Sequence, residues 1–115
     1  MNINGVELNI DFTDADLIEK IDEGNKIVQE EVKKLEDNRG EISPAEGIRQ
    51  ECKILKDFLD YVFGDGISEK IFGNKDSLKE CLQAFEDIIN ERNSQLNNLQ
   101  DVVNKYSPDR LKRWI

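Results

Sequence analysis

Residues 43–63 read SPAEGIRQECKILKDFLDYVF, and the start of this stretch is the clearest local signal in the chain. Ser43 can cap a helix with its hydroxyl, Pro44 suits the first helical position because no N–H needs a partner there, and Glu46 can reach back to the cap. Apolar residues then recur at steps of three and four, which predicts a core-facing helix over 44–63. That apolar face consists of Ile48, Cys52, Leu55, Leu59 and Val62, widened by Ile54, Phe58 and Tyr61.

A second helix is predicted over 14–38, before the capped stretch. Thr13 is expected to cap its start, and Gly40 can end it in the left-handed conformation. Gly24 lies inside this helix, where glycine costs about 1 kcal/mol relative to alanine. It indicates a kink, the close approach of a neighbouring backbone or, most simply, weak packing. The apolar face consists of Leu17, Ile21, Val28, Val32 and Leu35, with Ile18 and Ile27 beside it.

Residues 1–12 alternate apolar and polar side chains, as a strand with one covered face does. Asn4 and Gly5 can adopt the positive φ angles of a tight turn, so this segment predicts a small β-hairpin. Two strands alone are only marginally stable in water. We expect the hairpin to pack on the chain's own helices, with addition of a strand from another molecule as the alternative.

Downstream, residues 67–72 have room for about one helical turn, and a third long helix is predicted over 75–106. At about 1.5 Å per residue the three long helices measure roughly 37, 30 and 48 Å, so the second cannot cover the third throughout. The surplus apolar residues must pack on the first helix, fold back after a break near residues 92–94, or bind another protein. These candidate partner contacts are Leu96, Leu99, Val102, Val103 and Tyr106.

Together the elements predict a mainly α fold, a three-helix antiparallel bundle or hairpin with a short N-terminal β-hairpin and a short C-terminal helical turn. We expect the 115 residues to form a single domain, with 107–115 as a C-terminal tail that contains the last turn. Leu, Ile, Val and Phe make up about 30% of the chain, which is enough for a modest core.

The composition argues against several classes of function. There are 25 acidic and 16 basic residues, a net charge of −9, whereas binding to nucleic acid needs clustered Lys and Arg. The chain has no His, the commonest general base and metal ligand, and its two cysteines are expected to be buried apolar residues. No apolar run approaches the ~20 residues that span a bilayer, and we expect no cleavable leader. We therefore expect no enzymatic activity, cofactor, metal, nucleic-acid partner or membrane partner.

Two stretches resemble a known group of proteins. The opening, NINGVELNIDFTDAD at residues 2–16, and the middle, DFLDYVFGDGISEKIFG at residues 57–73, are similar to parts of small proteins from the tail modules of siphophages and prophages of Gram-positive bacteria. The resemblance identifies the chain as tail assembly chaperone-like. It also places Phe63 and Phe72 in a recurring middle pattern, which is compatible with helical-hairpin packing or with a contact site.

The resemblance implies a non-enzymatic protein that binds the phage tape measure protein, with the tail tube protein as a further partner. Such chaperones act in the cytoplasm of the bacterial host and are not expected in the mature virion. A homo-oligomer is left open. The alternatives are a structural virion or head–tail adaptor protein, which stays in the particle, and an acidic regulatory protein that mimics nucleic acid.

Overall fold

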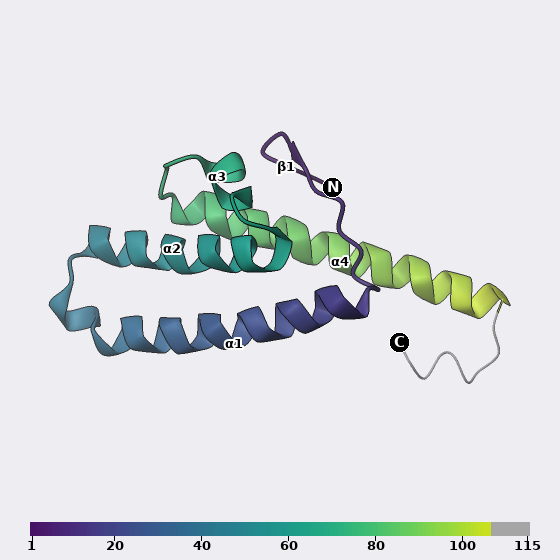
Figure 1. Ribbon diagram of the computed structural model, residues 1–115, viewed down its shortest axis with the longest axis horizontal. Helices are drawn as coiled ribbons and strands as arrows, with labels where there is room; N and C mark the ends of the chain where they lie inside the picture. Colours follow the sequence, from purple (N-terminus) through teal and green to yellow (C-terminus); the bar gives the residue numbers. More distant parts are fainter. Residues whose placement is uncertain (107–115) are drawn as a thin grey trace.

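The computed structural model describes residues 1–106, and it confirms a mainly helical fold with a short antiparallel hairpin at the N-terminus (Figure 1). The elements are strands β1 (Asn2–Ile3) and β2 (Val6–Glu7), helices α1 (Ala15–Asp37), α2 (Pro44–Phe63), α3 (Ile67–Phe72) and α4 (Leu78–Tyr106), and a 3-10 turn, η1 (Arg39–Glu41). The predicted C-terminal helical turn falls in residues 107–115, outside the described residues.

Local capping explains where the first two long helices begin. The hydroxyl of Ser43 accepts a hydrogen bond from the amide of Glu46 at 3.1 Å, and Pro44 opens α2, as predicted. The prediction that Thr13 caps α1 is wrong, because Asp14 takes that position. The carboxylate of Asp14 accepts hydrogen bonds from two first-turn amides at 2.8 and 3.4 Å. Its negative charge also complements the helix dipole, which a hydroxyl cannot do.

The direction of α4 differs from the predicted bundle. α1 and α2 are joined by a short connection and run antiparallel (Figure 1). Cys52 of α2 lies beside Cys81 of α4, and the ring centroids of Phe58 and Phe85 are 5.4 Å apart, so these two helices advance in the same direction. The segment 64–77, which includes α3, returns the chain along α2 before α4 begins. The three-helix antiparallel bundle is therefore not confirmed, since α2 and α4 are parallel.

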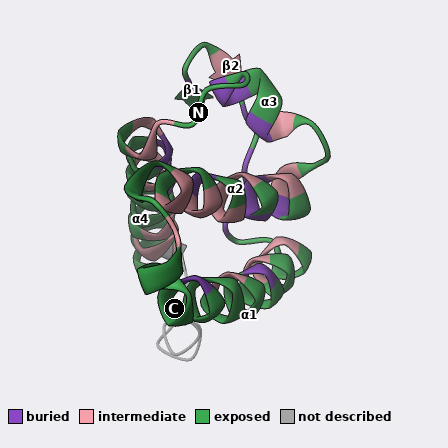
Figure 2. Cartoon of the chain, turned by 90° about the vertical axis from the view of Figure 1, so that its left-hand side faces the viewer, coloured by how far each residue is buried: buried purple, intermediate pink, exposed green. Residues whose placement is uncertain are grey.

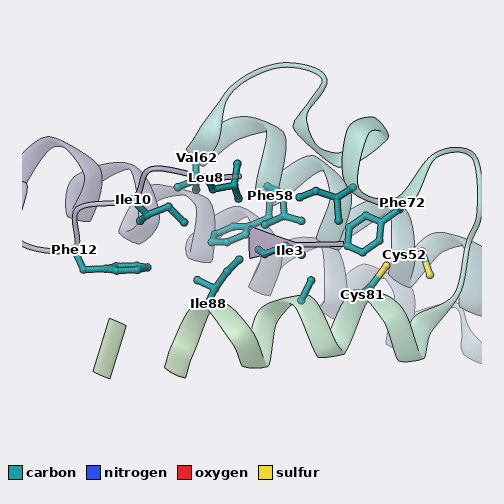
Figure 3. Packing of buried hydrophobic residues seen from close by; sticks show 13 residues of the cluster. Ile3, Leu8, Ile10, Phe12, Cys52, Phe58, Val62, Phe72, Cys81 and Ile88 are labelled. Carbon is teal, nitrogen blue, oxygen red and sulfur yellow. The ribbon is translucent and has the colours of Figure 1, made fainter. Parts of the chain in front are cut away.

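The hydrophobic core lies where the N-terminal arm, residues 1–13, crosses α2, α3 and α4 (Figure 3). The hairpin thus packs on the chain's own helices, as expected. Burying each large apolar side chain contributes roughly 1.5–3 kcal/mol. The core members are Ile3, Leu8, Ile10 and Phe12 of the arm; Cys52, Phe58, Leu59 and Val62 of α2; Ile71 and Phe72 of α3; and Cys81, Ala84 and Ile88 of α4.

Hydrogen bonds from side chains hold the N-terminal arm on the helices. The amide of Phe12 donates to Oε1 of Gln95 at 2.8 Å, and Nε2 of Gln95 donates to the carbonyl of Ile10 at 2.6 Å. The Gln95 carboxamide thereby supplies the donor and acceptor that a neighbouring strand would otherwise provide. Near the hairpin turn, Nδ2 of Asn4 donates to the carbonyl of Ile71 at 3.3 Å.

The molecule is elongated. Its radius of gyration is 17.0 Å, whereas a compact domain of this length has a value of about 13 Å. The last part of α4 extends past the ends of α1 and α2 (Figure 1), and the end view shows a largely exposed α1 (Figure 2). Within residues 1–106 no helix is both long enough and apolar enough to cross a membrane.

Candidate protein-binding surfaces

A groove with a volume of about 620 Å³ runs between α1 and α2. Ile27 on the α1 wall and Tyr61 on the α2 wall are 49% and 43% exposed, so the groove offers a substantial apolar surface from both helices. A groove of this kind receives the apolar side chains of an amphipathic helix. The apolar lining consists of Ile27, Val28, Leu35, Ile54, Phe58 and Tyr61, and the polar lining of Glu31, Lys34, Asn38, Gln50, Lys53 and Asp57.

Gly24 lets the two helices that form the groove approach closely. A Cβ atom on Gly24 would lie 2.8 Å from Cε2 of Phe58, closer than carbon atoms can approach. The ring of Phe58 also contacts Phe85, so this one side chain joins α1, α2 and α4. The expected weak packing at Gly24 is wrong, because a crowded aromatic contact requires the glycine.

The charged groups along the groove are paired within each helix. Nζ of Lys53 lies 2.7 Å from Asp57, whose carboxylate raises the pKa of the lysine. On α1, Nζ of Lys34 lies 3.3 Å from a carboxylate oxygen of Glu31. Because each pair is nearly neutral, the groove presents mainly apolar surface and little net charge.

Tyr61 is held in the groove wall by α1. Its hydroxyl donates a hydrogen bond to Glu23 at 2.6 Å, and this bond to a carboxylate raises the pKa of the phenol. The bond fixes one edge of the ring, so that the exposed ring face forms a preorganised part of the groove. An exposed aromatic ring positioned in this way is a common anchor in protein–protein contacts.

The predicted contact residues on α4 lie on one continuous helix. α4 passes through Arg92 without the break that one alternative required. Val102 is 53% exposed, whereas Leu96, Leu99 and Val103 are half-buried. Tyr106 ends the helix, and its side chain lies outside the described part of the structure.

The two contact candidates from the recurring middle pattern lie in or against the core. Phe72 is buried in the core between α3 and its neighbours, and Phe63 is half-buried against the same core. Their side chains stabilise the return segment that makes α2 and α4 parallel. The structure therefore gives them a packing role, and Phe72 has too little exposed surface to contact a partner.

The sequence reasoning missed the groove between α1 and α2. A signal for it was present in α2, where Ile54, Phe58 and Tyr61 widen the apolar face beyond what one neighbouring helix covers. An apolar face this wide indicates that the helix either packs against two neighbouring elements or leaves part of that face exposed. On α1 the corresponding signal is Ile27, which stands beside the main apolar stripe.

Residues 1–106 contain no group of three or more Cys, Asp or Glu side chains that could hold a metal ion. Cys52 and Cys81 are both completely buried, as expected. Burial, together with the adjacent Cys52, raises the pKa of the Cys81 thiol to about 12, so that it is protonated at neutral pH. A protonated, buried thiol is a poor nucleophile.

The fold and these surfaces define a mainly helical protein with an apolar groove on a helical hairpin. The sequence model of DUF6673, a family of unknown function, matches residues 4–114, and the chain belongs to this family. Comparison with curated proteins and with solved structures gave no match.

Proposed function

We propose that this protein is a phage tail assembly chaperone that binds the helical tape measure protein during tail morphogenesis. It acts in the cytoplasm of the bacterial host and leaves before the virion is complete. The observation that carries the proposal is the groove between α1 and α2, where Ile27 and Tyr61 expose apolar surface on facing walls. The resemblance of residues 2–16 and 57–73 to tail assembly chaperones supplies the identity of the bound helix.

The groove suits one helix laid along the α1–α2 hairpin. A partner helix bound there would insert apolar side chains at its positions i, i+3, i+4 and i+7 between Ile27 and Tyr61. The paired charges of Lys34 and Lys53 at the margin impose no strong preference for a charged partner. Such a surface fits a long client that presents many similar apolar segments.

The acidity of the chain supports a holding role. Residues 1–42 contain 12 acidic and five basic residues, and the whole chain has a net charge of −9. A complex covered on its outside by acidic helices repels its neighbours in solution. The chaperone can thus mask apolar surface of the client and keep the complexes apart before the tail tube protein assembles.

Co-expression with tape measure protein fragments, followed by affinity capture, tests the proposal. The wild-type chain should retain at least one fragment, and Ile27→Asp should reduce capture at least about tenfold, because the substitution places a carboxylate in the apolar groove. Val32→Asp is the matched control. Val32 lies on the same helix and is 36% exposed, but it does not line the groove. Its substitution should leave capture intact.

Three results would count against the chaperone. Failure of the wild-type chain to retain any part of the tape measure protein would contradict it directly. Abundant protein in purified virions, measured by mass spectrometry, would favour a structural adaptor instead. If Glu30→Lys with Glu31→Lys abolished function while Ile27→Asp did not, an acidic nucleic-acid mimic would be the better assignment.

A further inference from the structure

Other elements of the chain cover one face of α4 in the first half of the helix, whereas the second half of that face extends beyond them. Cys81, Ala84 and Ile88 follow the helical repeat and are buried under α2 and the N-terminal arm. The described hydrogen bonds between the arm and α4 are both made by Gln95. The last part of α4 then extends past the ends of α1 and α2 (Figure 1).

The same helix face stays apolar beyond the covered region. Leu99 and Val102 follow Gln95 at steps of four and three, which places them on the continuation of the buried stripe. Leu99 is half-buried and Val102 is 53% exposed. The described structure thus leaves an apolar strip on the part of α4 that projects from the body.

The sequence segment that carries this strip is almost without charge. Residues 93–104 contain one charged side chain, Asp101, in a chain whose residues are 36% charged. The remaining polar side chains of the segment are neutral: Asn93, Ser94, Gln95, Asn97, Asn98, Gln100 and Asn104. The segment therefore differs sharply from the acidic surface of α1.

We propose that residues 93–104 bind the same residues of a second copy of this chain, as a two-fold symmetric pair of helices. Two copies with a net charge of −9 repel each other, and a nearly uncharged segment is where they can meet at the least electrostatic cost. Asn and Gln side chains both donate and accept hydrogen bonds, so identical surfaces satisfy each other across a two-fold axis. An acidic or a basic partner would gain almost no charge pairing here.

The size of the segment predicts a weak dimer. Twelve helical residues span about 18 Å. A pair of such helices buries less than the roughly 1,200–2,000 Å² of a stable interface. The dimer should form at high protein concentration and dissociate on dilution. Added salt should favour it, because salt screens the repulsion between the two acidic bodies.

Sedimentation velocity over about 10 µM to 1 mM protein tests this pairing. The wild-type chain should shift from monomer to dimer across that range. Val102→Asp should weaken the dimer at least about tenfold, since it places two carboxylates in one small interface. Leu82→Asp is the matched control, because Leu82 lies on the first half of α4 with the same exposed fraction of 53% and receives the same charge. It should dimerise like the wild type. Circular dichroism should show that both variants keep their helix content.

Two outcomes would overturn the pairing. A wild-type chain that stays monomeric over the whole concentration range excludes it. If Val102→Asp then also lost capture of tape measure fragments, this strip would be a binding site for the client helix instead. Equal dimerisation of the wild type and Val102→Asp would place the interface elsewhere. The proposal stands or falls separately from the proposed function, because the capture test depends on Ile27 in the groove.

Discussion

In the first half of α4, Cys81, Ala84 and Ile88 are buried beneath α2 and the N-terminal arm, whereas in the second half Val102 is half-exposed on the same helix. Both halves have apolar residues at helical spacing, and neither contains a break. The difference is therefore one of surroundings rather than of helix formation. It shows that an apolar stripe identifies a contact surface but does not tell whether the partner lies in the same chain.

The largest difference in stability should appear when a buried side chain in the first half of α4 and an exposed one in the second half are each truncated to alanine. Ile88→Ala leaves a cavity in the core and should lower the free energy of unfolding by about 2–5 kcal/mol. Val102→Ala should change it by no more than about 0.5 kcal/mol, because Val102 is exposed in the monomer. Denaturant unfolding of dilute protein, followed by circular dichroism, measures both. Equal losses would show that the second half of α4 is also packed within one molecule.

A smaller effect is expected at the boundary between the halves. Gln95→Glu keeps the acceptor for the amide of Phe12 but replaces the donor to the carbonyl of Ile10 with a carboxylate near Glu91. We expect the free energy of unfolding at neutral pH to fall by about 1–3 kcal/mol. The folded state raises the pKa of the introduced carboxyl, so protonation restores a donor.

The deficit of Gln95→Glu relative to the wild type should therefore shrink as the pH falls through that raised pKa. Gln95→Leu provides the control, because it loses both hydrogen bonds to the N-terminal arm without adding a titratable group. Its deficit relative to the wild type should not depend on pH. A Gln95→Leu variant as stable as the wild type would show that Gln95 does not hold the N-terminal arm, and a pH-independent deficit of Gln95→Glu would show that the introduced carboxyl does not face the carbonyl of Ile10.

A third comparison tests the close packing of α1 against α2 at Gly24. Gly24→Ala should lower the free energy of unfolding by about 1–2 kcal/mol, because the clash with Phe58 outweighs the gain in helix propensity. Gly47→Ala is the matched change in α2, where the new methyl group would lie 3.8 Å from Ile42, an ordinary contact. It should stabilise the protein by up to about 1 kcal/mol. Thermal unfolding of both variants measures the contrast, and stabilisation by both would contradict the close packing at Gly24.

The smallest effect on stability is expected from a cysteine substitution that reports how accessible each half of α4 is to a thiol reagent. Cys52 and Cys81 should resist alkylation in the folded protein at pH 8, since both are buried and the pKa of Cys81 is about 12. Val102→Cys should add one rapidly reacting thiol in dilute solution. Mass spectrometry after brief iodoacetamide treatment counts the modified sites. Rapid labelling of the two native cysteines would show that the first half of α4 opens from its cover.

Much of the fold could be predicted from local signals. Ser43 and Pro44 mark the start of α2, and the Asn4–Gly5 turn closes the N-terminal hairpin, because caps and tight turns depend on neighbouring residues alone. The apolar stripe on α4 was also readable from its spacing. The groove was missed because Ile27 and Tyr61 come from different helices and lie 34 residues apart in the sequence.

The amino-acid sequence by itself determined where the helices and the hairpin form, the acidity of the surface and the nearly uncharged segment at residues 93–104. Only the tertiary structure decided that α4 runs parallel to α2, that Phe58 occupies the space beside Gly24, and that the cover of α4 ends near Gln95. Local structure follows from backbone geometry and nearest neighbours. The direction of a helix and the extent of its cover depend on contacts between residues far apart in the chain, which periodicity does not encode.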